Sequence, residues 1–252
     1  MRHMLYCIFF LLLLNCKKTS KIEVVERMVE AQEAVSEDSL KLDLNFKPKG
    51  NYTELRHKII NDKAYFKRRY QTDRTKAIDS ASNYIYTTLL NGIVPHWYGT
   101  TWDFNGHTDI PNNGEIACGY FVSTTLKHLG FNLNRYKMAQ AAGLNEAKLL
   151  QQKSSLKIFS GLSLDELKSR VNTVYGDGLY FVGLDNHVGY VLILNKELYF
   201  LHSSYCDDKV VLELAEDSYC FSSNLYVFAE ITTNRSLVES WILNTRLRIP
   251  NT

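Results

Sequence analysis

The sequence predicts an α+β domain in which helices come first and an antiparallel sheet follows. Apolar residues recur at helical spacing through residues 53–91 and again after Cys118. Five short runs rich in β-branched and aromatic residues follow, at 179–184, 187–194, 198–203, 210–214 and 225–231, and polar turns separate them. With 252 residues, of which 45% are hydrophobic, the chain is long enough for one domain with a substantial core.

The N-terminus has the features of a targeting segment. Met4 opens an unbroken apolar run of eleven residues, too short to span a membrane, which takes about 20 residues. Cys16 follows, between Asn15 and two lysines, and this arrangement resembles the lipobox of bacterial lipoproteins. The alternative is an ordinary secretory signal with a chance cysteine. In both cases the folded part faces an extracytoplasmic space.

The lipobox resemblance divides the chain into three parts. We expect a signal peptide over 1–15, a polar tether over 16–50 whose Cys16 carries lipid, and a folded domain over 51–252. The lipid would anchor the protein to a membrane of the cell envelope, either periplasmic or at the cell surface.

Three features are predicted within the helical part of the domain. Gly92 and Pro95 are expected to end the first helical run. A loop rich in aromatic residues and glycine occupies 96–106. The segment 137–176 is predicted to be a mainly helical insert, with a capping box that begins at Ser163.

Cys118 is the candidate nucleophile because it stands at the predicted start of a helix that Gly130 ends. Unpaired backbone N–H groups and the helix dipole at such a position stabilise a thiolate, so the sequence predicts a lowered thiol pKa. The alternative is a buried cysteine with a packing role only.

His187 and His202 are expected to meet on one face of a β-hairpin. If Asn195 and Lys196 form a two-residue turn, facing residues pair so that both histidines point to the same side. Gly189 between them leaves room for the contact. A three-residue turn would place the histidines on opposite faces.

These strings resemble the NlpC-type cell-wall peptidases of the papain-like cysteine peptidase superfamily. The resemblance runs from Tyr98 through the strings CGYFV at 118–122 and HVGY at 187–190 to LHS at 201–203, and it covers about residues 97–205. It implies a papain-like domain with N-terminal helices, a catalytic helix and a five-stranded antiparallel sheet. The string ACGYF at 117–121 departs from the usual DCSGF of the family, and the helical insert is a further departure.

The resemblance also implies roles for individual residues. Cys118 would attack an amide carbonyl, His187 would be the base, and His202 would hold its imidazole in the useful tautomer. The backbone N–H of Cys118 is one expected oxyanion donor, and the Tyr98 hydroxyl is a candidate for the second.

Three further residues of the preceding loop are candidates for the substrate cleft. Asn112 precedes the cysteine by six residues, which resembles the placement of the papain glutamine, and Trp97 and Trp102 would wall the cleft. The alternative for Tyr98 and the two tryptophans is simple packing of the loop on the sheet.

Several classes of function are not expected. A formal net charge of +2 gives no basic face for nucleic acid. No zinc-binding or phosphate-binding motif occurs, so neither a metal nor a cofactor is predicted, although His96 and His107 could in principle join other histidines around zinc. Cys206 and Cys220 are either a disulfide pair or two independent buried thiols.

The sequence therefore favours a lipid-anchored cysteine peptidase or amidase, and the resemblance implies peptidoglycan stem peptides as its substrate. A cysteine amidase or deamidase acting on a protein or a small amide would use the same residues. A non-catalytic lipoprotein that binds envelope components through the aromatic loop is the third reading. Nothing in the sequence sets the oligomeric state.

Overall fold

The computed structural model describes residues 46–152 and 154–249. The predicted signal peptide over 1–15, the lipid site at Cys16 and all of the tether except residues 46–50 lie outside this part of the chain. No helix within the described ranges combines the length and the apolar character that a membrane crossing requires.

Helices precede a sheet, as the sequence predicts, and a last helix follows the sheet. The described helical elements are α2 (Tyr52–Thr72), α3 (Arg74–Thr87), the π-helical segment η1 (Thr88–Ile93), α4 (Val94–Trp97), α5 (Cys118–His128), α6 (Arg135–Ala139), α7 (Gly143–Gln151), α8 (Leu164–Val174), the 3-10 turn η2 (Tyr219–Phe221) and α9 (Arg235–Leu243). The strands are β1 (Lys157–Ser160), β2 (Gly178–Gly183), β3 (Val188–Leu194), β4 (Glu197–Ser204), β5 (Lys209–Leu214) and β6 (Leu225–Glu230).

The sheet has six strands in the order β1-β6-β2-β3-β4-β5, and every neighbouring pair is antiparallel. The α+β class is confirmed, but the prediction of five strands is wrong. The additional strand β1 lies inside the insert that we expected to be mainly helical, and it pairs with β6 at the edge of the sheet. Its four residues are too few and too exposed to give an alternating pattern, since even Ile158 is exposed.

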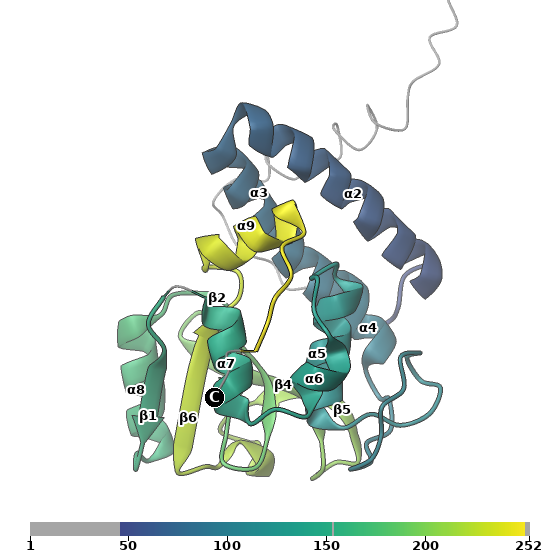
Figure 1. Ribbon diagram of the computed structural model, residues 1–252. Helices are drawn as coiled ribbons and strands as arrows, with labels where there is room; N and C mark the ends of the chain where they lie inside the picture. Colours follow the sequence, from purple (N-terminus) through teal and green to yellow (C-terminus); the bar gives the residue numbers. More distant parts are fainter. Residues whose placement is uncertain (1–45, 153, 250–252) are drawn as a thin grey trace, which may run out of the picture. The chain divides into compact units, whose positions relative to one another are not determined.

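Helices cover both faces of the sheet (Figure 1). On one face α5 contacts β3 and β4, and α7 contacts β2 and β6. On the other face α8 contributes Leu167 and Val171 to a buried core that also contains Val191 of β3 and Phe200 of β4. Side chains of a strand alternate between the faces, so odd-numbered residues of β3 and even-numbered residues of β4 belong to the α8 side.

The long helical run before the loop at 96–106 is broken in the middle. Asp73 ends α2, and its side chain accepts a hydrogen bond from the backbone N–H of Lys76 to cap α3. The prediction that Gly92 and Pro95 end the first helical run is wrong, because the chain stays helical through η1 and α4. Gly92 lies inside the π-helical segment, and Pro95 occupies the first turn of α4, where no backbone N–H is needed.

Two predicted helix boundaries are confirmed. Helix α5 begins at Cys118, and Gly130 follows its end with a φ of 96°, a conformation that favours glycine. Helix α8 begins with the predicted capping box, in which Ser163 and Glu166 cap each other's backbone N–H groups. The first of these boundaries is the one that positions the candidate nucleophile.

Candidate active site

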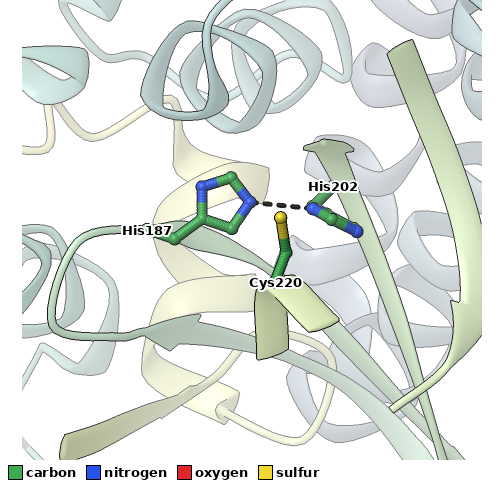
Figure 2. A group of neighbouring side chains, drawn as sticks. All are labelled: His187, His202 and Cys220. Atoms are coloured by element: carbon green, nitrogen blue, oxygen red, sulfur yellow. Dashed lines mark hydrogen bonds between the residues drawn. The ribbon is translucent and has the colours of Figure 1, made fainter. Parts of the chain in front are cut away.

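The β3–β4 hairpin brings His187 and His202 together. Asn195 and Lys196 form its two-residue turn with φ values of 52° and 67°, and Leu194 pairs with Glu197. The predicted register is therefore confirmed. Nε2 of His187 lies 2.8 Å from Nδ1 of His202, and Figure 2 shows the two rings joined by this hydrogen bond.

Glu213 of β5 extends the pair into a chain of three groups. Its Oε1 lies 3.0 Å from Nε2 of His202, and this hydrogen bond holds the pKa of the Glu213 carboxyl below its usual value. A carboxylate can only accept, so Nε2 of His202 carries the proton and its Nδ1 is left with a lone pair. His187 must then donate from Nε2, which leaves the lone pair of His187 on Nδ1.

His187 is held in its neutral form. Burial, together with repulsion from His202, lowers the pKa of His187 to about 3. Its Nδ1 is buried and has no hydrogen-bonding partner in the structure. An unpaired buried acceptor is costly, so this nitrogen is an unused proton acceptor inside the protein.

Cys118 lies at the N-terminus of α5, as predicted, but the expected lowering of its thiol pKa is wrong. Burial is the largest effect and raises the pKa of Cys118, and the nearby carboxyl of Glu146 acts in the same direction. Backbone N–H groups of Val188, Gly119 and Cys118 itself favour the thiolate, but they do not outweigh the loss of solvent. The resting thiol of Cys118 and the resting imidazole of His187 are therefore both neutral.

Cys118 and the histidine pair belong to elements on opposite faces of the sheet. Tyr190 of β3 points to α5, where its hydroxyl contacts Thr125 at 2.7 Å, whereas His202 shares a strand face with Phe200 on the α8 side. The ring of His187 contacts those of His202 and Phe200, so it lies with them on the α8 side and not on the face that α5 covers. Val188, the next residue, directs its backbone N–H to the Cys118 sulfur, although no hydrogen bond yet joins thiol and imidazole.

The connection between α6 and α7 packs across this region. A Cβ on Gly119 would lie 2.6 Å from the carbonyl oxygen of Ala139. A Cβ on Gly143 would lie 3.1 Å from Cα of Gly183 and 3.2 Å from a methyl group of Val188. The predicted insert therefore packs against Gly119 and Val188 through the segment 139–143, which we call the strap, and Cys118 beside them stays partly exposed.

The loop before Cys118 contributes less to the site than predicted. Trp97 is fully buried, donates from Nε1 to the Tyr52 hydroxyl at 2.6 Å and packs against Phe121, so it belongs to the core and does not wall a cleft. Tyr98 stacks on Phe46 with ring centroids 4.2 Å apart. Phe46 belongs to the predicted tether, and this contact packs it against the folded domain.

Asn112 and Trp102 differ in what they contact. The side chain of Asn112 donates to the carbonyl of His96 at 2.7 Å and so stabilises the loop. Trp102 lies 6.1 Å from the ring of Tyr205, which in turn lies 5.0 Å from the ring of His187. Of the four loop candidates, Trp102 is thus the one that the ring contacts link to the histidine pair.

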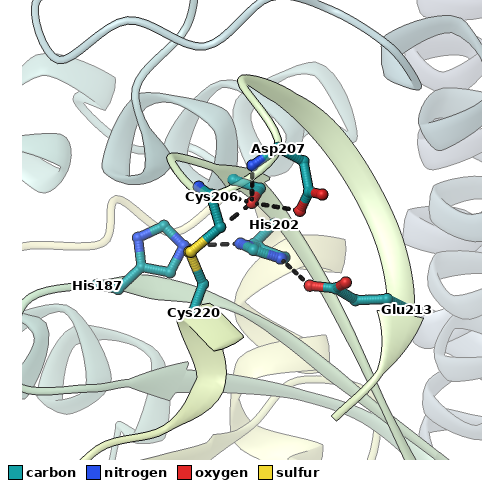
Figure 3. The surroundings of a disulfide bond; sticks show 7 residues. His187, His202, Cys206, Asp207, Glu213 and Cys220 are labelled. Atoms are coloured by element: carbon teal, nitrogen blue, oxygen red, sulfur yellow. Dashed lines mark hydrogen bonds and ion pairs between the residues drawn. A yellow bond between two sulfur atoms is a disulfide. The ribbon is translucent and has the colours of Figure 1, made fainter. Parts of the chain in front are cut away.

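Cys206 and Cys220 form a disulfide, which settles an alternative that the sequence left open. Figure 3 shows the disulfide beside the two histidines, with Glu213 behind His202. The sulfur of Cys220, Nε2 or Nδ1 of His187 and a ring nitrogen of His202 all lie within 4.8 Å of one another. Cys118 is the only cysteine without a disulfide among the residues that the structure describes.

Sequence reasoning missed Glu213 and Tyr205. Glu213 interrupts an apolar strand, and as the partner of Phe200 it lies diagonally across from His202. A charged residue on the inner face of a predicted strand is a signal that could have found it. Tyr205 follows β4 directly, but only the turn after the strand places it against His187.

Gly189 tests the packing that holds the histidine pair. A Cβ at this position would lie 2.6 Å from Cε2 of Phe200 and 2.9 Å from Cβ of His202. We expect Gly189→Ala to reduce the free energy of unfolding by about 1–3 kcal/mol, because Phe200 and His202 must move. Urea denaturation measures this change. Gly176→Ala is the matched control, since nothing lies within 4 Å of its added Cβ, and an equal loss in both variants would contradict the packing argument.

Comparisons with known proteins identify no relative: no family model, no curated protein and no solved structure matches this chain.

Proposed function

We propose that this chain is a cysteine hydrolase that cleaves an amide bond through a thioester on Cys118. The observation that supports this most strongly is the hydrogen-bonded chain from Glu213 through His202 to His187. It directs the lone pair of His187 to Nδ1, the buried nitrogen without a partner, and the Cys118 sulfur contacts the backbone of the very next residue. Covalent catalysis requires an oriented base within reach of the nucleophile, so the proposal requires Nδ1 of His187 to come within reach of the Cys118 sulfur.

The resting protonation states favour a concerted attack. The thiol proton would pass to Nδ1 of His187 as the sulfur bonds to the carbonyl carbon, and His202 and Glu213 would stabilise the imidazolium that forms. The same proton would then go to the leaving amine. Water would hydrolyse the thioester with His187 again acting as base, which restores the thiol.

The backbone N–H groups around the sulfur suit the developing oxyanion. The backbone N–H groups of Val188, Gly119 and Cys118 favour a negative charge at the thiol, and the proposal assigns them to the oxyanion that would form beside it. Cys118 is partly exposed, and the strap packs on its neighbour Gly119 and on Val188, so the strap would border the path of a peptide to the sulfur.

Peptidoglycan stem peptides are the substrate class that we propose, and a papain-like fold of the NlpC type accompanies that proposal. Both rest on the resemblance of the strings around Cys118, His187 and His202. The proposed location in the cell envelope agrees with the disulfide between Cys206 and Cys220, because disulfides persist in oxidising compartments.

Digestion of purified peptidoglycan tests the proposal. The full chain should release peptides with new amine ends that mass spectrometry detects, and Cys118→Ser should release none because its hydroxyl is a far weaker nucleophile. Equal digests from both proteins would contradict the role of Cys118. If neither protein generates new ends, peptidoglycan is not the substrate.

A further inference from the structure

We propose that reduction of the Cys206–Cys220 disulfide turns this cluster into a zinc site built from His187, His202, Cys206 and Cys220. Two thiolates and two imidazoles are a donor set that tetrahedral Zn²⁺ prefers. Within the described residues, His187, His202 and Cys220 form the one group of three or more His, Cys, Asp or Glu side chains whose ligand atoms gather closely enough for a metal. Cys206 is covalently joined to the third member and supplies the fourth donor.

The two histidine nitrogens need to move little, whereas the two sulfurs must separate once the disulfide is broken. In a tetrahedral site with Zn–N bonds of about 2.0–2.1 Å, neighbouring nitrogens lie roughly 3.3 Å apart. Nε2 of His187 and Nδ1 of His202 are 2.8 Å apart, so the rings must separate slightly. Figure 2 shows the sulfur of Cys220 beside the hydrogen bond that links these two nitrogens.

The surroundings already supply the outer contacts that a histidine ligand needs. A zinc-bound histidine usually donates its second ring N–H to a carboxylate, which fixes the tautomer. Nε2 of His202 has that contact with Glu213 at 3.0 Å, and Nδ1 is the nitrogen left for the metal. The Ser204 oxygen lies 3.7 Å from the sulfur of Cys220, but its hydroxyl donates to Oδ2 of Asp207 at 2.8 Å, so it provides no donor for a thiolate.

Reduction and metal binding are two separate steps. A dithiol reductant supplies two electrons and two protons, the S–S bond breaks, and the dithiol becomes a disulfide. Zn²⁺ then binds the two thiolates and releases their two protons, while the proton on Nε2 of His187 moves to Nδ1. Cys206 and its neighbours in the turn 205–208 are exposed, so an opened turn gives the ion a path inward.

Zinc binding would also inhibit the proposed hydrolase, and this consequence rests on the proposed function. With the metal on Nε2, Nδ1 of His187 carries the proton and can no longer take one from Cys118. The oxidised chain would be the active form and the reduced, zinc-loaded chain the inactive one.

Cobalt titration of the full chain tests the zinc site without any activity readout. The chain is reduced with a water-soluble phosphine, which becomes the phosphine oxide by taking oxygen from water, and the excess is removed without air. We expect one Co²⁺ per reduced chain, with the visible absorption bands of tetrahedral cobalt and thiolate charge transfer, displaced by Zn²⁺. The oxidised chain should show none of these bands. A reduced chain without the bands overturns the proposal.

Matched variants locate the site. Cys206→Ser combined with Cys220→Ser should abolish the bands, and His57→Ala, an exposed histidine of α2, should leave them unchanged. Glu213→Gln keeps all four ligands and should weaken zinc affinity about 10–100-fold, so the test remains valid if the double variant does not fold. Bands that survive the loss of both cysteines in a folded chain would overturn the proposal.

Cys118→Ser separates the two proposals. This variant should bind Co²⁺ as the unaltered chain does, although it cannot hydrolyse an amide. Zinc should also protect Cys206 and Cys220 from alkylation in peptide mapping. Metal binding without hydrolysis of any amide would leave the zinc site standing and remove the proposed function, and hydrolysis without metal binding would do the reverse.

Discussion

His187→Ala is expected to lower the rate of amide hydrolysis by about 10²–10⁴-fold, the range that a positioned general base contributes. The cause is specific to this site: the carboxylate of Glu213 fixes the tautomer of His202, which in turn leaves the lone pair of His187 on Nδ1. Without that nitrogen, the thiol of Cys118 has no acceptor for its proton, and burial already keeps the thiol protonated. The rate is measured from the release of amine ends by the purified variant.

A graded series of variants gives this prediction its control. Glu213→Gln should cause a smaller loss than His187→Ala, because an amide can still contact His202 but no longer dictates which nitrogen holds the proton. His57→Ala removes an exposed histidine and should leave the rate unchanged. Thermal melts confirm that each variant is folded. A folded His187→Ala protein that retains the rate of the unaltered chain would exclude His187 as the base.

Glu146→Gln is expected to stabilise the protein at pH 7 by up to about 3 kcal/mol and to have little effect at pH 4. Glu146 is buried in α7, one of its carboxyl oxygens has no partner, and burial raises its pKa well above the ordinary value of 4.5. At pH 7 the unfolded chain holds this carboxyl ionised, so folding must add a proton. The cost is absent below pH 4.5 and grows as the pH rises above it. Glutamine keeps the shape and does not titrate.

Urea denaturation at the two pH values measures the difference between the unaltered chain and the variant. Glu115→Gln is the matched control, since Glu115 is exposed and its substitution should change the free energy of unfolding little at either pH. A Glu146→Gln protein whose stability follows that of the unaltered chain at both pH values would show that the carboxyl reaches solvent or a partner when ionised.

Local patterns predicted much of the scaffold. The two-residue turn at Asn195 and Lys196 determined the register that brings His187 to His202. With this turn length, the alternation of side chains places both histidines on the same face of the sheet. The helix start at Cys118 followed from apolar spacing and from Gly130. Strand β1 could not be predicted in the same way, because an exposed four-residue edge strand carries almost no pattern and exists through its pairing with β6.

The pKa of the candidate nucleophile and the packing partners of the predicted cleft residues depended on contacts between segments that are distant in the sequence. A helix N-terminus predicts a more acidic thiol, yet loss of solvent around the Cys118 thiol is the larger effect and raises its pKa. Trp97 appears in the sequence as a cleft residue, but its indole packs into the core against Phe121 and bonds to Tyr52. Neither outcome could be predicted from the local sequence. The loss of solvent around a side chain depends on every segment that packs against it, including segments far away in the sequence.

The sequence by itself determined that His187 and His202 meet on the hairpin, that a helix begins at the candidate nucleophile Cys118, and that the chain is α+β. These properties depend on spacing and turn chemistry, which act over a few residues. The tertiary structure alone decided that Glu213 orients the histidine pair, that Cys206 and Cys220 are joined beside it, and that the thiol is neutral at rest. Those properties depend on which remote segments pack together and exclude water. The residues near a position in the sequence do not show which segments these are.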